Sequence, residues 1–70
     1  MGAEIWLADF KTGAPAARLP QAYLAQLALY RAAVQELYPG KAVRAFVLWL
    51  EGPRLQEASS AELDATLAAL

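Results

Sequence analysis

Residues 4–11 read EIWLADFK and residues 43–50 read VRAFVLWL, and these two stretches decide the fold. Both are rich in aliphatic and aromatic residues that favour strands, and Thr12-Gly13 ends the first one. Apolar side chains stand at odd and at even positions, so both faces of each strand would be apolar. Such strands are typical of the covered interior of a sheet. We therefore expect two interior strands, over 4–11 and over 43–50.

The segment between these strands carries one long helical pattern. Pro20 suits the first turn of a helix, where its missing N–H is not needed. From residue 21 to residue 38 apolar side chains recur with helical period, and Pro39-Gly40 ends the pattern. The apolar stripe consists of Tyr23, Leu24, Leu27, Tyr30, Val34, Leu37 and Tyr38. We expect a helix over 21–38 that packs across the sheet and connects the two strands.

The rest of the chain predicts a turn, a short strand and a second helix. Gly52-Pro53 turns the chain, and residues 54–57 are expected to return as a strand. Ser59 and Glu62 have the spacing of a capping box, which opens a helix over 60–70. The order is therefore β-α-β-(β)-α. It indicates an α/β fold with a small mixed sheet and a crossover helix.

Composition narrows the kinds of site that the chain can hold. Its 70 residues include no cysteine and no histidine, which excludes disulfides, cysteine-based zinc sites and histidine-dependent catalytic triads. Hydrophobic residues make up 59%, which is high for a small domain with a large surface. Two explanations are open: a fragment whose apolar faces meet more protein, or an obligate oligomer.

Charge and hydropathy give weaker indications. The formal net charge is −1 and no basic stripe is visible, so bulk electrostatics do not indicate nucleic-acid binding. The longest apolar run, residues 45–50, is far too short to span a bilayer, and no signal-peptide pattern is present. The absence of cysteine fits a cytoplasmic protein. We expect a cytoplasmic location with no membrane partner.

Asp9 and Lys11 stand two residues apart at the end of the first strand, so their side chains share one face. A carboxylate oxygen is a ligand that Mg²⁺ prefers. A neighbouring ammonium can orient an attacking water and stabilise charge that develops on a phosphate. The pair therefore suits metal-assisted hydrolysis of phosphodiester bonds. The same pair also fits a solvated ion pair on the surface.

Gln26 and Tyr30 stand four residues apart in the expected helix, so they are neighbours on its surface. A helix that packs over the first strand would bring them close to Asp9 and Lys11. There they could bond to a metal ligand, to a water or to a DNA phosphate. The alternative is that Tyr30 is a core residue with its hydroxyl at the rim, and that Gln26 lies on the surface.

The strand end Ala8-Asp9-Phe10-Lys11-Thr12, followed by Gln26 and Tyr30 in a helix, resembles the RecB-like nucleases of the PD-(D/E)XK superfamily. Residues 23–31 and 44–55 extend the similarity to the nuclease domain of bacterial AddA-type helicase–nuclease subunits. The resemblance covers about residues 4–70. It implies that residues 1–70 are a C-terminal fragment of such a domain, with a partial restriction-endonuclease-like fold.

The resemblance also implies roles for individual residues. Asp9 would be a ligand of Mg²⁺, Lys11 the catalytic lysine, and Gln26 and Tyr30 the helix motif beside the active site. The parent protein would be a metal-dependent DNA exonuclease that acts in double-strand break repair and recombination. Its partners would be DNA and a second nuclease–helicase subunit.

The sequence departs from this family by omission. A further metal-binding aspartate and an acidic residue or histidine on an earlier helix are missing, and no G-x-x-x-x-G-K-[ST] motif occurs. ATP would therefore be used only by helicase domains that lie outside these residues. We expect the isolated chain to be inactive, and to self-associate through an unpaired strand edge and uncovered apolar faces.

Two interpretations without catalysis are also open. The chain could be a non-catalytic α/β binding or dimerisation module, or an unrelated small homodimer. In each case we expect Trp6 and Trp49 to lie in the core, because large aromatic residues on central strands usually do. The remaining basic residues are expected at the surface: Arg18, Arg31, Lys41 and Arg54.

Overall fold

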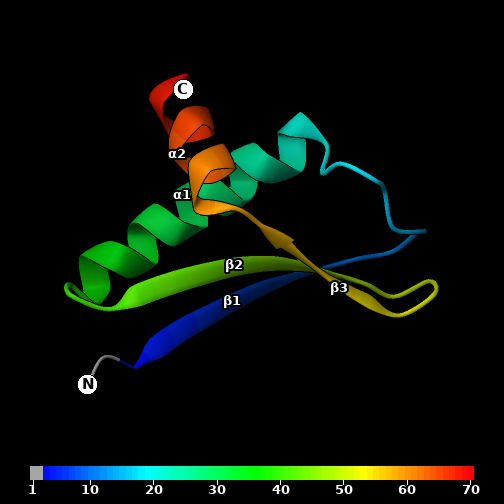
Figure 1. Ribbon diagram of the computed structural model, residues 1–70, viewed down its shortest axis with the longest axis horizontal. Coiled ribbons are helices and arrows are strands. Elements are labelled where there is room, and N and C mark those ends of the chain that lie inside the picture. The colour runs from blue at the N-terminus through cyan, green and yellow to red at the C-terminus, as the bar shows by residue number, and fades with distance from the viewer. Residues whose placement is uncertain (1–2) are drawn as a thin grey trace.

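The computed structural model describes residues 3–70 as a three-stranded sheet with two helices on one of its faces (Figure 1). The elements are β1 (Glu4–Lys11), α1 (Gln21–Leu37), β2 (Ala42–Trp49), β3 (Arg54–Ala58) and α2 (Ser60–Ala68). β2 lies in the middle of the sheet, parallel to β1 and antiparallel to β3. The predicted α/β class, order of elements and mixed sheet are confirmed. β1 has the predicted bounds, and the bounds of the other elements differ from the predicted ones by one or two residues.

α1 is the crossover that a parallel strand pair requires, since two parallel strands cannot be joined by a tight turn. The core lies between the two helices and the sheet face that they cover. β2 contributes alternate residues to it, and Trp49 is buried as predicted. The other buried residues of this core are Leu19, Leu24, Leu27, Ala28, Ala45, Val47, Ala58 and Leu63. No helix within residues 3–70 is both long and apolar enough to span a bilayer.

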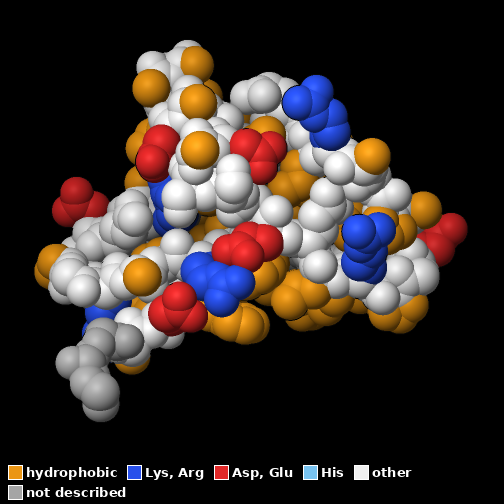
Figure 2. Space-filling model, in the orientation of Figure 1, with side chains coloured by type: hydrophobic (Ala, Val, Ile, Leu, Met, Phe, Trp, Pro, Cys, Tyr) orange, Lys and Arg blue, Asp and Glu red, His pale blue; other side chains and the backbone are white. Residues whose placement is uncertain are grey.

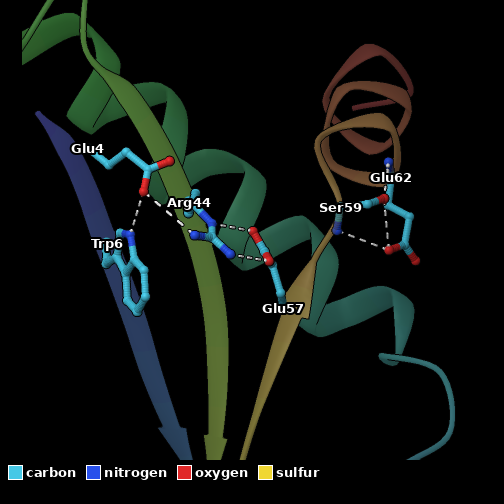
Figure 3. A network of polar contacts seen from close by, with 6 residues as sticks. All are labelled: Glu4, Trp6, Arg44, Glu57, Ser59 and Glu62. Carbon is cyan, nitrogen blue, oxygen red and sulfur yellow. Dashed lines mark hydrogen bonds and ion pairs between the residues drawn. The ribbon is translucent and has the colours of Figure 1, made fainter. Parts of the chain in front are cut away.

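The two helices begin in different ways. At α1, Pro20 precedes the first turn and offers no side-chain cap. At α2, the Ser59 hydroxyl accepts a hydrogen bond from the Glu62 backbone N–H, while the Ser59 N–H donates to the Glu62 carboxylate (Figure 3). This reciprocal arrangement satisfies two donors that a helix start otherwise leaves unpaired. The predicted capping box is therefore confirmed.

The second face of the sheet is uncovered in the part of the chain that the structure describes (Figure 1). β1 is an edge strand there, and Trp6 and Phe10 are 57% and 63% exposed. The predictions that β1 is an interior strand and that Trp6 lies in the core are therefore wrong for residues 3–70, whereas the unpaired strand edge expected for the isolated chain is confirmed. The physical reason is that apolar residues on both faces show what a strand could bury, but not whether a covering layer is present.

The prediction that Arg31 lies at the surface is also wrong. The Arg31 side chain is buried, with the residue only 5% exposed, and it forms an ion pair with Asp64 of α2. Arg31 stands four residues after Leu27, so it falls on the buried side of α1. Its long aliphatic stem can line apolar surface while the guanidinium reaches the partner helix. The far end of the predicted stripe, Leu37 and Tyr38, is exposed instead.

We predict that Leu27→Ala lowers the free energy of unfolding by about 2–5 kcal/mol, because the side chain is fully buried between α1 and the sheet. Leu37→Ala is the matched control on the same helix, since Leu37 is 73% exposed. It should change stability by no more than about 0.5 kcal/mol. Chemical denaturation of both variants measures the difference, and equal losses would contradict the placement of α1.

We also predict that the chain associates with itself, because the outer edge of β1 has no paired strand within residues 3–70 and its exposed face carries Trp6 and Phe10. Sedimentation equilibrium should give a mass above the 7.5 kDa of one chain at high micromolar concentration. Trp6→Lys should weaken association, whereas Leu37→Lys should not. A clean monomer over the whole concentration range would contradict the prediction.

Candidate functional site

Asp9 and Lys11 lie at the carboxyl end of β1, and both project from the face of the sheet that α1 covers. Strand alternation places them with the half-buried positions of β1 rather than with the exposed ones. In the parallel pairing with β2, Asp9 lies beside Val47 and Lys11 beside Trp49. Lys11 Nζ lies 2.9 Å from Asp9 Oδ2, which forms an ion pair.

The structure brings Gln26 and Tyr30 of α1 to this pair. Lys11 Nζ donates a hydrogen bond to Gln26 Oε1 at 3.0 Å, and Gln26 Nε2 donates to the Tyr30 hydroxyl at 3.1 Å. The four side chains therefore form one continuous chain of polar contacts from the strand to the helix. The predicted proximity of the strand pair to the helix pair is confirmed.

The Lys11 ammonium carries a positive charge at neutral pH. Contact with the Asp9 carboxylate raises the pKa of Lys11 above its ordinary value of 10.5, although desolvation opposes this change. A group that stays protonated cannot accept a proton from a water molecule. Within this cluster Lys11 can therefore attract and orient an anion or a water, but it cannot act as a general base at neutral pH.

The cluster supplies only part of a metal site. No group of three or more acidic, histidine or cysteine residues within residues 3–70 could hold a metal ion. Asp9 is the one carboxylate of the cluster, and its buried Oδ2 is paired with the Lys11 ammonium at 2.9 Å. Lys11 pairs with one of the two carboxylate oxygens, and carboxylate oxygens are ligands that a hard cation prefers. Asp9 therefore fits the role of one Mg²⁺ ligand, and further ligands would have to come from other groups.

Sequence analysis missed a third residue of α1 at this place, Tyr23. Its ring centroid lies 4.7 Å from Lys11 Nζ, and the ring also packs against Trp49 at a centroid distance of 5.9 Å. The signal was present in the spacing. Tyr23 stands three residues before Gln26, so both project from one side of the helix.

A second polar group lies on the uncovered face of the sheet (Figure 3). Arg44 Nε and Nη2 each donate a hydrogen bond of 2.8 Å to Glu57, and Arg44 Nη1 lies 3.6 Å from Glu4. The guanidinium also lies over the rings of Trp6 and Phe46. Figure 2 shows such acidic and basic side chains side by side, with hydrophobic side chains along the edge below them.

The charges of this uncovered face are satisfied internally. One arginine lies between two glutamates, so the group has no excess of positive charge to attract the phosphates of a nucleic acid. Apolar and aromatic side chains surround it. The face therefore resembles a surface that packs against protein more than one that binds DNA.

A surface cavity of about 360 Å³ lies between the start of α1 and α2. Gln21 and Leu24 line it, and a helical rotation of about 100° per residue turns them away from Gln26 and Tyr30. None of the four candidate residues borders the cavity. Arg18 and Glu62 bring opposite charges to its lining, so the cavity indicates no particular ligand.

Comparison of the chain with protein-family models, with curated proteins and with solved structures finds no match. The interpretation of the site therefore depends on the geometry above and on the likeness of its motifs.

We predict that Glu57 contributes pH-dependent stability. Its pKa is lowered by the hydrogen bonds from Arg44, with desolvation opposing, so the folded state binds protons less readily than the unfolded state. The stabilisation should be complete above the ordinary value of 4.5 and be lost as the pH falls below it. The free energy of unfolding, measured by chemical denaturation at several pH values, should fall less steeply in acid for Glu57→Gln than for the unmodified chain.

The control for this experiment is Glu51→Gln, on the exposed turn after β2. It should leave the acid branch of the stability curve unchanged. The effect of Glu57→Gln should also shrink at high salt, because the ion pair is solvent-exposed and salt screens it. If the free energy of unfolding falls equally steeply in acid for Glu57→Gln and for the unmodified chain, the ion pair of Glu57 with Arg44 does not contribute pH-dependent stability.

Proposed function

We propose that the chain is the C-terminal part of a RecB-like PD-(D/E)XK nuclease domain in an AddA-type helicase–nuclease subunit. Its reaction would be the metal-dependent hydrolysis of DNA phosphodiester bonds during double-strand break repair, in the cytoplasm. One observation carries the proposal. Asp9 and Lys11 of β1 and Gln26 and Tyr30 of α1 meet in a single chain of polar contacts.

In this proposal Lys11 supplies positive charge at the phosphate that is attacked. Its raised pKa keeps it protonated, so it stabilises developing negative charge and orients the attacking water. Gln26 holds the ammonium through its carbonyl oxygen. The Tyr30 hydroxyl accepts a hydrogen bond from Gln26, which leaves its own O–H free to donate to a phosphate oxygen.

Asp9 would bind Mg²⁺ together with ligands from other parts of the parent protein. A bound Mg²⁺ supplies charge neutralisation and lowers the pKa of a water attached to it. The support for this role is the half-buried place of Asp9 at the end of β1, where Lys11 pairs with only one of its two carboxylate oxygens. DNA and a second nuclease–helicase subunit would be the partners, and ATP would be used only by helicase domains outside residues 1–70.

A non-catalytic α/β binding or dimerisation module is the second candidate function. The observation that favours it is the uncovered sheet face, where Trp6 and Phe10 are exposed and the charges of Arg44 are already paired. Such a face would bury apolar surface against protein. This alternative assigns no catalytic role to Asp9 or Lys11, so substitution of Lys11 separates the two proposals.

We predict that Lys11→Ala lowers kcat for Mg²⁺-dependent DNA cleavage by about 10²–10³-fold, the usual effect of removing one group that stabilises the transition state. The assay uses the protein translated from the full reading frame that encodes these residues. Lys41→Ala is the matched control. Lys41 is exposed and directly precedes the amino end of β2, whereas Lys11 lies at the carboxyl end of β1. Equal activity of the two variants would leave the binding module as the better account.

We predict that the 70-residue chain alone does not degrade DNA in Mg²⁺, because its cluster contains a single carboxylate and affinity for Mg²⁺ depends on the number of oxygen ligands. Gel analysis of linear DNA after incubation with the pure chain measures this. Robust digestion that Asp9→Ala abolishes would contradict the view that the site is partial.

A further inference from the structure

Among residues 3–70, the Lys11 ammonium contacts two polar side chains and the face of one aromatic ring. Asp9 Oδ2 lies 2.9 Å away and Gln26 Oε1 lies 3.0 Å away. The third is the face of the Tyr23 ring, at 4.7 Å from its centroid. A cation is attracted to the face of an aromatic ring by the ring quadrupole. The ring therefore restricts the position of the ammonium. It does not compete with Asp9 and Gln26 for the hydrogen bonds of that ammonium.

Tyr23 is itself held in place from the core. Its ring packs against Trp49, which is buried and donates a hydrogen bond of 2.8 Å from Nε1 to Gln56 of β3. Trp49 is also the register partner of Lys11 in the parallel strand pair. The Tyr23 ring thus lies between α1 and the ends of β1 and β2. It packs against Trp49 of β2 and lies over the ammonium of Lys11 of β1.

We infer that Tyr23 is a positioning residue for Lys11, and that the face of its ring holds the lysine side chain beside Asp9 and Gln26. Lysine is otherwise a flexible side chain with many accessible rotamers. A ring anchored on the buried Trp49 restricts that freedom at the strand end. The catalytic consequence rests on the proposed function, whereas the contact itself does not.

The first test compares three variants in the DNA cleavage assay of the full protein. Tyr23→Phe keeps the ring and should retain kcat within about 2-fold, whereas Tyr23→Leu removes it and should lower kcat by about 10-fold or more with little change in KM. Tyr38→Leu, at the exposed end of α1, is the control and should resemble the unmodified protein. Equal losses in Tyr23→Phe and Tyr23→Leu would overturn the role of the ring.

The second test does not depend on activity. Protons next to an ammonium that lies over a ring face resonate upfield, so the ε-methylene protons of Lys11 should be shifted upfield in the NMR spectrum of the unmodified chain. The shift should persist in Tyr23→Phe and vanish in Tyr23→Leu. Its absence from the unmodified chain would overturn the inference, whether or not the leucine variant folds.

The two tests separate this inference from the proposed function. If Lys11→Ala leaves DNA cleavage unchanged, the proposed function is wrong, and the ring-induced shift of Lys11 still decides whether Tyr23 positions it. If Lys11→Ala abolishes cleavage while Tyr23→Leu changes neither kcat nor the Lys11 spectrum, the proposed function stands and the positioning role is wrong.

Discussion

The parallel pairing of β1 with β2 is the constraint on which the rest of the structure depends. Its register sets Lys11 beside Trp49 at one end of the sheet. Because parallel strands need a long connection, α1 crosses the sheet between β1 and β2, over the face that carries Asp9 and Lys11. This crossing brings Gln26 and Tyr30 to the end of β1. The candidate site is therefore a consequence of topology. The opposite face carries Trp6 and Phe10, which stay exposed within residues 3–70.

Local features of the fold could be predicted from the sequence because local chemistry determines them. Residues that favour strands, a proline before the first helix and the capping box at Ser59 each act within a few residues, and the elements appear close to their predicted bounds. Burial could not be predicted as well. Trp6 looks like a core residue from its own strand, and Arg31 like a surface residue from its charge. Each depends on a layer or partner that no local pattern encodes.

The candidate site divides in the same way. Strand alternation places Asp9 with Lys11, and helical spacing places Gln26 with Tyr30, so each pair could be predicted alone. Their proximity could be predicted as well, since a helix packed over the first strand brings them together, but the specific contact of Lys11 with Gln26 comes only from the packed structure. Tyr23 was missed because an apolar stripe residue is normally assigned to the core, whereas here it also contacts a charged group. The chemical roles of these residues remain proposals that rest on this geometry.

The most direct test of the account is to locate where a divalent cation binds the chain. Trace Mn²⁺ broadens the NMR signals of nuclei close to it even when binding is weak. The amide signals of residues 9–11 and the side-chain amide of Gln26 should broaden first, because Lys11 pairs with only one oxygen of the Asp9 carboxylate and Gln26 contacts the same ammonium. Signals near Glu57 should broaden later, since Arg44 donates a hydrogen bond to each of the two oxygens of that carboxylate. Broadening that begins at Glu57, or that spreads evenly over the chain, would contradict a cation site at the end of β1.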